Sequence, residues 1–220
     1  MNPREVRSFV RRAGRQTPAQ QRALIELWPR YGVADDGGLL DFGVLFGRDA
    51  PTTLEIGFGN GDHLAARALA APERNFLGVE VHRPGIGHLL RAAAAANLAN
   101  LRVAEQDAVV LLRERVPADA LDEVQILFPD PWPKKRHHKR RLIQPEFAVL
   151  VASRLRRGGR LHLATDWEPY ADQMRSVLEG CPLLATVTDE RLTSRAVTRF
   201  EQRGLRLGHG VCDLTCERRR

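Results

Sequence analysis

The spacing of apolar residues along the chain alternates between two periods. From Thr52 onward, short apolar runs alternate with stretches in which apolar residues recur every three or four positions. The short runs are typical of buried strands, and the 3.6-residue period indicates amphipathic helices. Strands are predicted at 52–57, 75–81, 101–106, 122–128 and 160–165, with helices at 62–70, 84–96, 108–115, 142–156 and 168–180. This order predicts an α/β fold with a mostly parallel sheet and helices on both faces.

The two ends of the chain depart from this rhythm. Residues 1–50 begin with scattered arginines, continue with a helix-like stretch at 18–28, and are then interrupted by glycines. We interpret them as a basic arm packed on a main domain that spans 51–220. The tail at 209–218 alternates apolar and polar residues, which predicts an antiparallel strand at the sheet edge.

Composition narrows the class of partner. The chain has 220 residues, 43% of them hydrophobic, which favours one well-buried domain. Its net charge of +7 favours a polyanionic partner such as a nucleic acid. Three cysteines form no paired framework, and neither a secretory leader nor a membrane-length apolar run is seen. We therefore expect a cytoplasmic protein without membrane contact. Its cysteines should be structural, and its histidines outside the basic segment at 134–141 should be structural or exposed rather than metal ligands.

The segment LEIGFGNG carries three glycines at the end of the first predicted strand and directly after it. Gly57, Gly59 and Gly61 permit positive φ and close approach of a ligand to the backbone. Asp62 stands where the dinucleotide fingerprint has its third glycine, and Glu55 precedes the first. These two acids would repel a pyrophosphate and would suit a ligand with a cationic or amino-bearing end.

Acidic residues recur at the ends of successive predicted strands. In a parallel sheet these ends meet at one edge, where ligands bind. An acid after the second strand can accept hydrogen bonds from both ribose hydroxyls, and an acid after the third would lie near an adenine. S-adenosylmethionine fits better than a dinucleotide because it carries ribose and adenine, no phosphate, and a positive sulfonium. Alternatives remain for single members, since a strand-end acid can be merely solvated and one after the third strand can cap the next helix. The acids are Glu55, Glu80, Asp107 and Asp130.

The fourth predicted strand ends in the unusual stretch FPDPWPKKRHHKRR. Pro129 and Pro131 restrict the backbone on both sides of Asp130 and would aim its carboxylate. Trp132 offers a flat face on which a base could stack. The following basic segment, Lys134–Arg141, supplies positive charge for phosphates. The alternative is an acid that caps a turn, followed by a solvated basic face.

Methyl transfer to a nucleic-acid base fits these residues best at guanine N7. The Pro-Pro-aromatic signature of exocyclic-amine methylation is absent, and no cysteine nucleophile stands at this strand end. Guanine N7 carries an in-plane lone pair and no proton, so it needs alignment with the donor methyl but no general base. A fixed carboxylate at Asp130 would stabilise the cationic product.

The chain resembles the bacterial tRNA (guanine-N7-)-methyltransferase family over nearly its whole length. The resemblance is carried by RSFVRRAGRQTPAQQRALIELWPRYG, LEIGFGNG, FLGVEVHRPGIGHLL, NLRVAEQDAV, FPDPWPKKRHHKRR, ATDWEPYADQM and TRFEQRGLRLGH. It implies a Rossmann-like class I methyltransferase fold. It also implies transfer of a methyl group from S-adenosylmethionine, which is consumed without a metal, to a guanine in the tRNA variable loop.

The resemblance also implies a role for each matching residue. Asp130 would lie at the reacting centre, and either Asp166 or Glu201 would accept hydrogen bonds from the guanine edge. The donor would be bound by Glu55, Gly57, Gly59, Gly61, Glu80, Asp107 and Asp130; the substrate by Lys134, Asp166, Thr198, Arg199, Phe200 and Glu201; and RNA by Arg136, His137, His138, Lys139, Arg140 and Arg141.

Two other functions remain open from the sequence. One is a non-catalytic RNA-binding module on the same fold. The other is a nicotinamide-dependent oxidoreductase, against which the missing third glycine and the acidic flanks argue. A monomer and a homodimer are equally compatible with the sequence.

Overall fold

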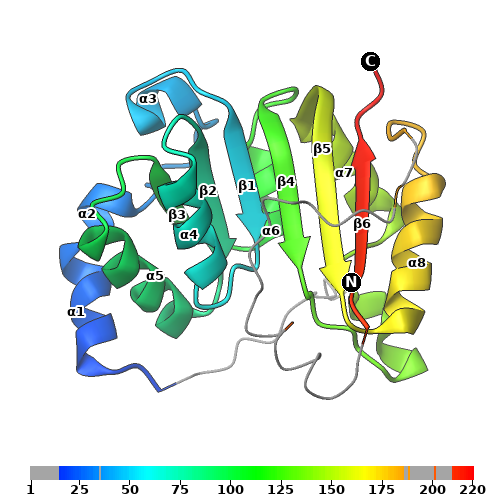
Figure 1. Cartoon of the computed structure of the whole chain (residues 1–220), viewed down its shortest axis with the longest axis horizontal. Coiled ribbons are helices and arrows are strands. Elements are labelled where there is room, and N and C mark those ends of the chain that lie inside the picture. The colour runs from blue at the N-terminus through cyan, green and yellow to red at the C-terminus, as the bar shows by residue number, and fades with distance from the viewer. Residues whose placement is uncertain (1–14, 35, 186–187, 189–200, 202–209) are drawn as a thin grey trace, which may run out of the picture.

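A single sheet organises the computed structural model, which describes residues 15–34, 36–185, 188, 201 and 210–220. Within these residues six strands lie in the order β3-β2-β1-β4-β5-β6 (Figure 1). Strands β1 to β5 run parallel, and β6 runs antiparallel to β5, which confirms the predicted fold class and the C-terminal edge strand. The strands are β1 Thr52–Ile56, β2 Asn75–Glu80, β3 Leu101–Glu105, β4 Leu121–Leu127, β5 Leu155–Thr165 and β6 Cys212–Glu217.

Helices connect these strands much as the apolar spacing predicted. Helix α4 matches its predicted range, and the segment after β3 is helical but changes from α-helix to one turn of π-helix. Within the described ranges no helix is long and apolar enough to span a bilayer. The helices are α1 Pro18–Glu26, α2 Trp28–Tyr31, α3 Phe42–Phe46, α4 Asp62–Ala70, α5 Arg83–Ala95, α6 Ala108–Val110, the π-turn η1 Leu111–Arg115, the 3-10 helix η2 Lys135–Arg140, α7 Pro145–Arg154 and α8 Glu168–Glu179.

Apolar side chains form a core on each face of the sheet. Alternate residues of a strand point to opposite faces, so neighbouring Phe76 and Leu77 of β2 enter different clusters. Phe76 packs among residues of α1, α4 and α5, including Leu64 and Leu89. Leu77 belongs to the cluster that α7 and α8 cover. Helix α1 packs on α5, so residues from the first fifty contribute to the core.

The parallel register brings the carboxyl ends of the strands together. Ile56 of β1 pairs with Val79 of β2 and Ile126 of β4, and Leu127 of β4 pairs with Ala164 of β5. These ends form the lower edge of the sheet in Figure 1, which we call the carboxyl edge. Residues that directly follow these strands are therefore neighbours in space, as the sequence predicted.

The predicted helix at 142–156 is too long. Helix α7 ends at Arg154 and strand β5 begins at the next residue, so Gly158 and Gly159 lie inside the strand and do not terminate a helix. The pairing of β4 with β5 is irregular here, and Gly158 adopts φ 74°. A side chain at Gly159 would place its Cβ 2.8 Å from the carbonyl oxygen of Arg156. The glycines therefore permit a bulge in the strand.

Candidate active site

The glycine loop adopts a backbone that other residues rarely tolerate. Gly57, Gly59 and Gly61 have φ values of 71°, 59° and 78°, all in the left-handed region. A Cβ at Gly61 would lie 2.7 Å from Leu89 of α5, whereas a Cβ at Gly57 would meet nothing within 4 Å. The loop is thus packed against the protein at one glycine and open at another, which leaves its backbone accessible to a ligand.

Glu80, the last residue of β2, holds this loop in place. Its Oε2 accepts a hydrogen bond from the Gly59 backbone N–H at 3.0 Å. Its Oε1 accepts from the backbone N–H groups of Val81 at 2.6 Å and His82 at 3.0 Å. An ionised carboxylate has about four acceptor positions, so one remains in this half-buried group for a ligand hydroxyl.

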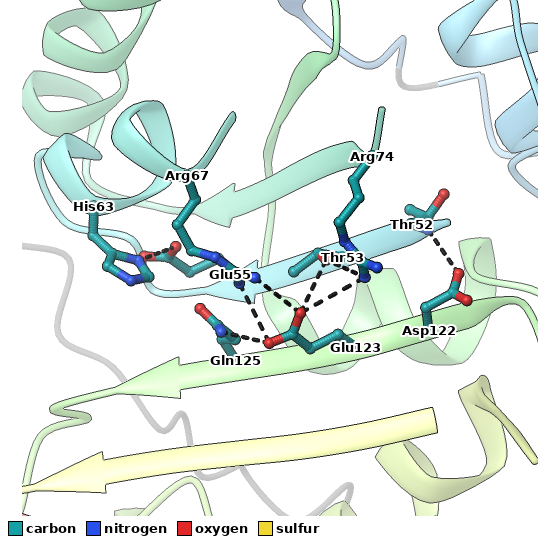
Figure 2. A network of polar contacts seen from close by, with 9 residues as sticks. All are labelled: Thr52, Thr53, Glu55, His63, Arg67, Arg74, Asp122, Glu123 and Gln125. Atoms are coloured by element: carbon teal, nitrogen blue, oxygen red, sulfur yellow. Dashed lines mark hydrogen bonds and ion pairs between the residues drawn. The ribbon is translucent and has the colours of Figure 1, made fainter. Parts of the chain in front are cut away.

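Glu55 is buried and has a partner that the sequence analysis did not assign. The side chain lies at the last-but-one position of β1 and is 3% exposed. Its Oε2 lies 2.9 Å from Nδ1 of His63, in the first turn of α4 (Figure 2). His63 Nε2 has no hydrogen-bond partner among the described residues. The signal in the sequence is a histidine placed directly after the glycine loop, eight positions beyond the strand acid.

Asp107 caps the helix that follows β3. Its Oδ1 accepts from the backbone N–H groups of Val109 at 2.7 Å and Val110 at 3.3 Å. The capping alternative that the sequence left open is therefore present in the structure. Both bonds use the same oxygen, so capping does not occupy the whole carboxylate.

Asp130 lies exposed in a turn formed by Phe128–Trp132, which we call the Asp130 turn. Phe128 and Trp132 have φ values of 54° and 45°, a conformation that is unfavourable for bulky residues. The backbone N–H of Phe128 donates to the Ala164 carbonyl of β5 at 2.7 Å. The turn is therefore attached to the end of β5, which continues into half-buried Asp166 and the exposed ring of Trp167.

The half-buried Trp132 ring contacts side chains of the protein itself. The guanidinium carbon of Arg140 lies 5.0 Å from the centroid of its ring, and His137 meets its edge at 5.8 Å. Trp132 therefore anchors the 3-10 helix of the basic segment, and an arginine already covers one ring face. Trp167, with 36% of its surface exposed, is the more accessible stacking surface at this edge.

The basic segment is mostly turned toward solvent. Lys134, Arg136, Lys139 and Arg140 are exposed, whereas the two histidines are half-buried. Desolvation and the positive charges of the neighbouring arginines and lysines lower the pKa of His137 below its ordinary value. His137 therefore gains its charge less readily than an isolated histidine.

Arg141 differs from the rest of this segment because it is 3% exposed. Its Nε donates to the Pro131 carbonyl at 2.8 Å, and its Nη1 donates to Gln173 Oε1 at 2.6 Å. Burial lowers the pKa of its guanidinium. The side chain points into the protein, whereas the sequence had grouped it with the RNA contacts.

The remaining substrate residues are only partly placed. Glu201 is 1% exposed, and Thr198, Arg199 and Phe200 lie outside the described residues. Asp166 and Glu201 therefore both stay candidates for the guanine edge. Within the part of the chain that the structure describes, no group of three or more histidine, cysteine or acidic side chains is arranged to hold a metal.

Glu123, near the start of β4, lies in a buried network further from the carboxyl edge (Figure 2). Glu123 accepts hydrogen bonds from Arg67 of α4 at 3.3 and 3.1 Å and from Gln125 at 2.6 Å, and lies 3.7 Å from Arg74. Desolvation raises the pKa of Glu123, but the charges of Arg67 and Arg74 and the bonds from Arg67 and Gln125 outweigh it, so the pKa falls below its ordinary value.

The carboxyl edge fits S-adenosylmethionine by its geometry. The glycine loop is open at Gly57, and the Glu80 carboxylate is fixed beside it in a half-buried position. The acids along the edge oppose a phosphate and suit the ribose hydroxyls and the positive methionine end of the donor.

Similar folds occur in solved methyltransferases. The 16S rRNA methyltransferase KamB matches with a TM-score of 0.58 and 18% identity, covering 96% of this chain and 97% of that chain. A phosphoethanolamine N-methyltransferase from Haemonchus contortus, solved with S-adenosyl-L-methionine, matches with a TM-score of 0.53 and 12% identity. The match covers 80% of this chain and 51% of that chain. The fold is that of the S-adenosylmethionine-dependent methyltransferases.

Sequence similarity narrows this class. Residues 49–214 match a family described as a putative methyltransferase. A tRNA (guanine-N(7)-)-methyltransferase of Nitrosococcus oceani is 54% identical over 217 residues, covering 98% of this chain and 92% of the relative. The chain belongs to the tRNA (guanine-N(7)-)-methyltransferase family.

Proposed function

We propose that this protein transfers the methyl group of S-adenosylmethionine to N7 of a guanine in the variable loop of tRNA. The observation that carries the proposal is the exposed Asp130 in a strained turn, on the same sheet edge as an open glycine loop. Family membership supports the choice of RNA and of the guanine nitrogen.

In this proposal the donor binds along the carboxyl edge. The backbone of Gly57, Gly59 and Gly61 lies against the methionine part, and the remaining acceptor position of Glu80 receives the ribose hydroxyls. The buried Glu55–His63 pair lies behind the loop and favours the positive methionine end. Asp107 lies nearest the adenine. The bound donor supplies an electrophilic methyl group on a positively charged sulfur.

Methylation of guanine N7 requires no general base from the protein. The in-plane lone pair of guanine N7 forms the new N–C bond while the methyl–sulfur bond breaks and its electron pair stays on sulfur. The positive charge thus moves from the sulfonium to the guanine ring, and no proton leaves in this step. Asp130 contributes a fixed negative charge beside the ring that becomes cationic.

Recognition of tRNA uses the residues around this turn. Guanine N7 is buried in the deep groove of an A-form helix, so an accessible loop position is the natural target. We assign Trp167 as a stacking surface for a base of that loop, because Trp132 is partly covered. The guanine and its neighbours are held by Lys134, Asp166, Thr198, Arg199, Phe200 and Glu201, and the phosphates by Arg136, His137, His138, Lys139 and Arg140.

Three further parts of the proposal follow from the same function. Residues 1–50 serve as a basic arm on the methyltransferase domain of residues 51–220. The methyl donor is consumed, and no metal takes part. The site of action is the cytoplasm, where unmodified tRNA is present.

The direct test uses purified protein, unmodified tRNA and S-adenosylmethionine. Borohydride reduction followed by aniline should cleave the product at one variable-loop position, because N7-methylguanine is labile to this treatment. A tRNA with adenine at that position should give no cleavage. The absence of cleavage above a no-enzyme control would contradict the proposed activity, and cleavage elsewhere would contradict the proposed target.

A further inference from the structure

The Asp130 turn is held in an unfavourable backbone conformation. Among the described non-glycine residues only four have positive φ: Asn97, Asp119, Phe128 and Trp132. Asn and Asp visit this region most easily, whereas a phenylalanine and a tryptophan are unusual there. The two unusual cases flank Asp130, so neighbouring contacts must keep the turn in place.

Arg141 makes one of the contacts that hold the turn. Its Nε donates to the carbonyl of Pro131, which is the peptide group directly before the strained Trp132. Its Nη1 donates to Gln173 Oε1 of α8 and, at 3.4 Å, to the Pro169 carbonyl. One planar guanidinium therefore joins the Asp130 turn to the first half of α8.

The aromatic ring of Tyr170 supports this guanidinium. The guanidinium carbon of Arg141 lies 4.8 Å from the centroid of the ring, and Tyr170 is fully buried. Burial raises the pKa of Tyr170 to about 12, and the negative charge of Asp130 adds to this shift.

A second set of bonds closes this arrangement. The backbone N–H of Ile143 donates to the Tyr170 hydroxyl at 3.1 Å, and Gln173 Nε2 donates to the Ile143 carbonyl at 3.1 Å. The third guanidinium nitrogen of Arg141, Nη2, is buried and has no hydrogen-bond partner among the described residues. Burying this cation is therefore costly, and its two bonded nitrogens are directed to the Asp130 turn and to α8.

We propose that Arg141 is a positioning residue: it binds no RNA, and it fixes the Asp130 turn against α8 so that Asp130 and Asp166 keep a constant separation. The inference rests on the proposed methyltransferase function, because it gives this separation a catalytic meaning. A lysine at this position cannot replace the guanidinium, because its single nitrogen cannot reach both Pro131 and Gln173 in the same planar geometry.

The test compares Arg141→Lys with Arg102→Lys. Arg102 provides a matched control because its guanidinium also donates to backbone carbonyls and stacks on an aromatic ring, Phe46, at 5.2 Å. It lies at the start of β3, on the opposite edge of the sheet. Both variants are assayed at a temperature at which circular dichroism shows them folded.

We expect Arg141→Lys to lower kcat about ten- to hundredfold while the Kd values for tRNA and for S-adenosylmethionine stay within about twofold, as small misplacement of a reacting group predicts. Arg102→Lys should keep kcat within about twofold. Unchanged kcat in Arg141→Lys would overturn the inference, and a raised Kd for tRNA with unchanged kcat would make Arg141 an RNA contact instead.

Gln173→Ala keeps the inference testable if Arg141→Lys does not fold. This change removes the closer of the two Nη1 acceptors on α8 and leaves Arg141 in place, and it should also lower kcat without raising the Kd for tRNA. Normal turnover in Gln173→Ala would count against the positioning role. If the wild-type protein itself does not methylate tRNA, the proposed function is refuted. That result is distinguishable from normal or reduced turnover in the variants, which is measured relative to an active wild type.

Discussion

Two acids, one inside strand β4 and one in the turn after it, lie in opposite surroundings. Glu123, near the start of the strand, is 7% exposed and is surrounded by Arg67, Arg74 and Gln125 (Figure 2). Asp130, just beyond the end, is exposed and precedes a segment of mostly exposed cations. The difference teaches how burial changes the use of an acid: the protein itself neutralises the buried Glu123, whereas the exposed Asp130 is open to solvent and, in the function proposed above, faces the substrate.

The largest effect should come from Glu123→Ala. Removal of this carboxylate leaves Arg67 buried without its partner, and breaking a buried ion pair costs about 3–5 kcal/mol in the free energy of unfolding. Urea denaturation measures this loss. Glu217→Ala is the control, because Glu217 pairs with Arg160 on the surface and should contribute about 1 kcal/mol or less. Equal losses in the two variants would contradict the distinction between buried and exposed acids.

Asp130→Asn should lower the rate of methyl transfer with little effect on stability. The amide keeps the size of the side chain but removes its charge, so the rate of methyl transfer should fall about 10²–10³-fold. Because Asp130 is exposed, the free energy of unfolding should change by about 0.5 kcal/mol or less. Single-turnover assays with saturating tRNA report the rate, and filter binding reports the affinity. A wild-type rate in this variant would remove Asp130 from the reacting centre.

Lowering the pH should separately reveal how much ionised Glu123 contributes to the free energy of unfolding. Its pKa in the folded protein is lower than the ordinary value of 4.5, so its stabilisation is complete above that value and is lost as the pH falls through the folded pKa. The difference in unfolding free energy between wild type and Glu123→Gln should therefore be constant near neutral pH and shrink as the pH falls below 4.5, the ordinary pKa of a glutamate. A difference that grows on acidification would contradict this ionisation.

The smallest effect should come from removing one exposed cation of the basic segment, which should weaken tRNA binding only. Lys139→Ala should weaken tRNA binding and reduce the slope of log affinity against log salt concentration by about one, without changing the rate at saturating tRNA. Arg157→Ala is the control, because Arg157 is equally exposed but lies at the start of β5, away from the carboxyl edge. An identical loss of slope in both variants would indicate binding by net charge alone.

The strands and the common edge of their acids were predictable because both depend on local pattern and on parallel direction. The period of the apolar residues defines β1 to β4 closely, and parallel pairing then brings the strand ends together. The start of β5 was not predictable in the same way. A glycine pair after a helical stretch usually marks a helix end, whereas here it allows an irregular strand.

The roles of individual charged residues were harder to predict from the sequence. Arg140 and Arg141 are adjacent and chemically identical, yet one covers Trp132 and the other is buried against Tyr170 and Gln173 of α8. That separation depends on contacts about thirty residues away, which residue type cannot encode. The pairing of Glu55 with His63 was missed for the same reason, since it depends on how α4 packs on β1.

The antiparallel direction of β6 has a practical consequence for experiments on this protein. Because the strand runs opposite to β5, the chain leaves it at the amino edge of the sheet, opposite the carboxyl ends of β1, β4 and β5 (Figure 1). Arg218 is fastened there by bonds to Asp119 and to the Leu155 carbonyl. A fluorophore or purification handle attached after Arg220 should leave the path of an incoming tRNA unobstructed.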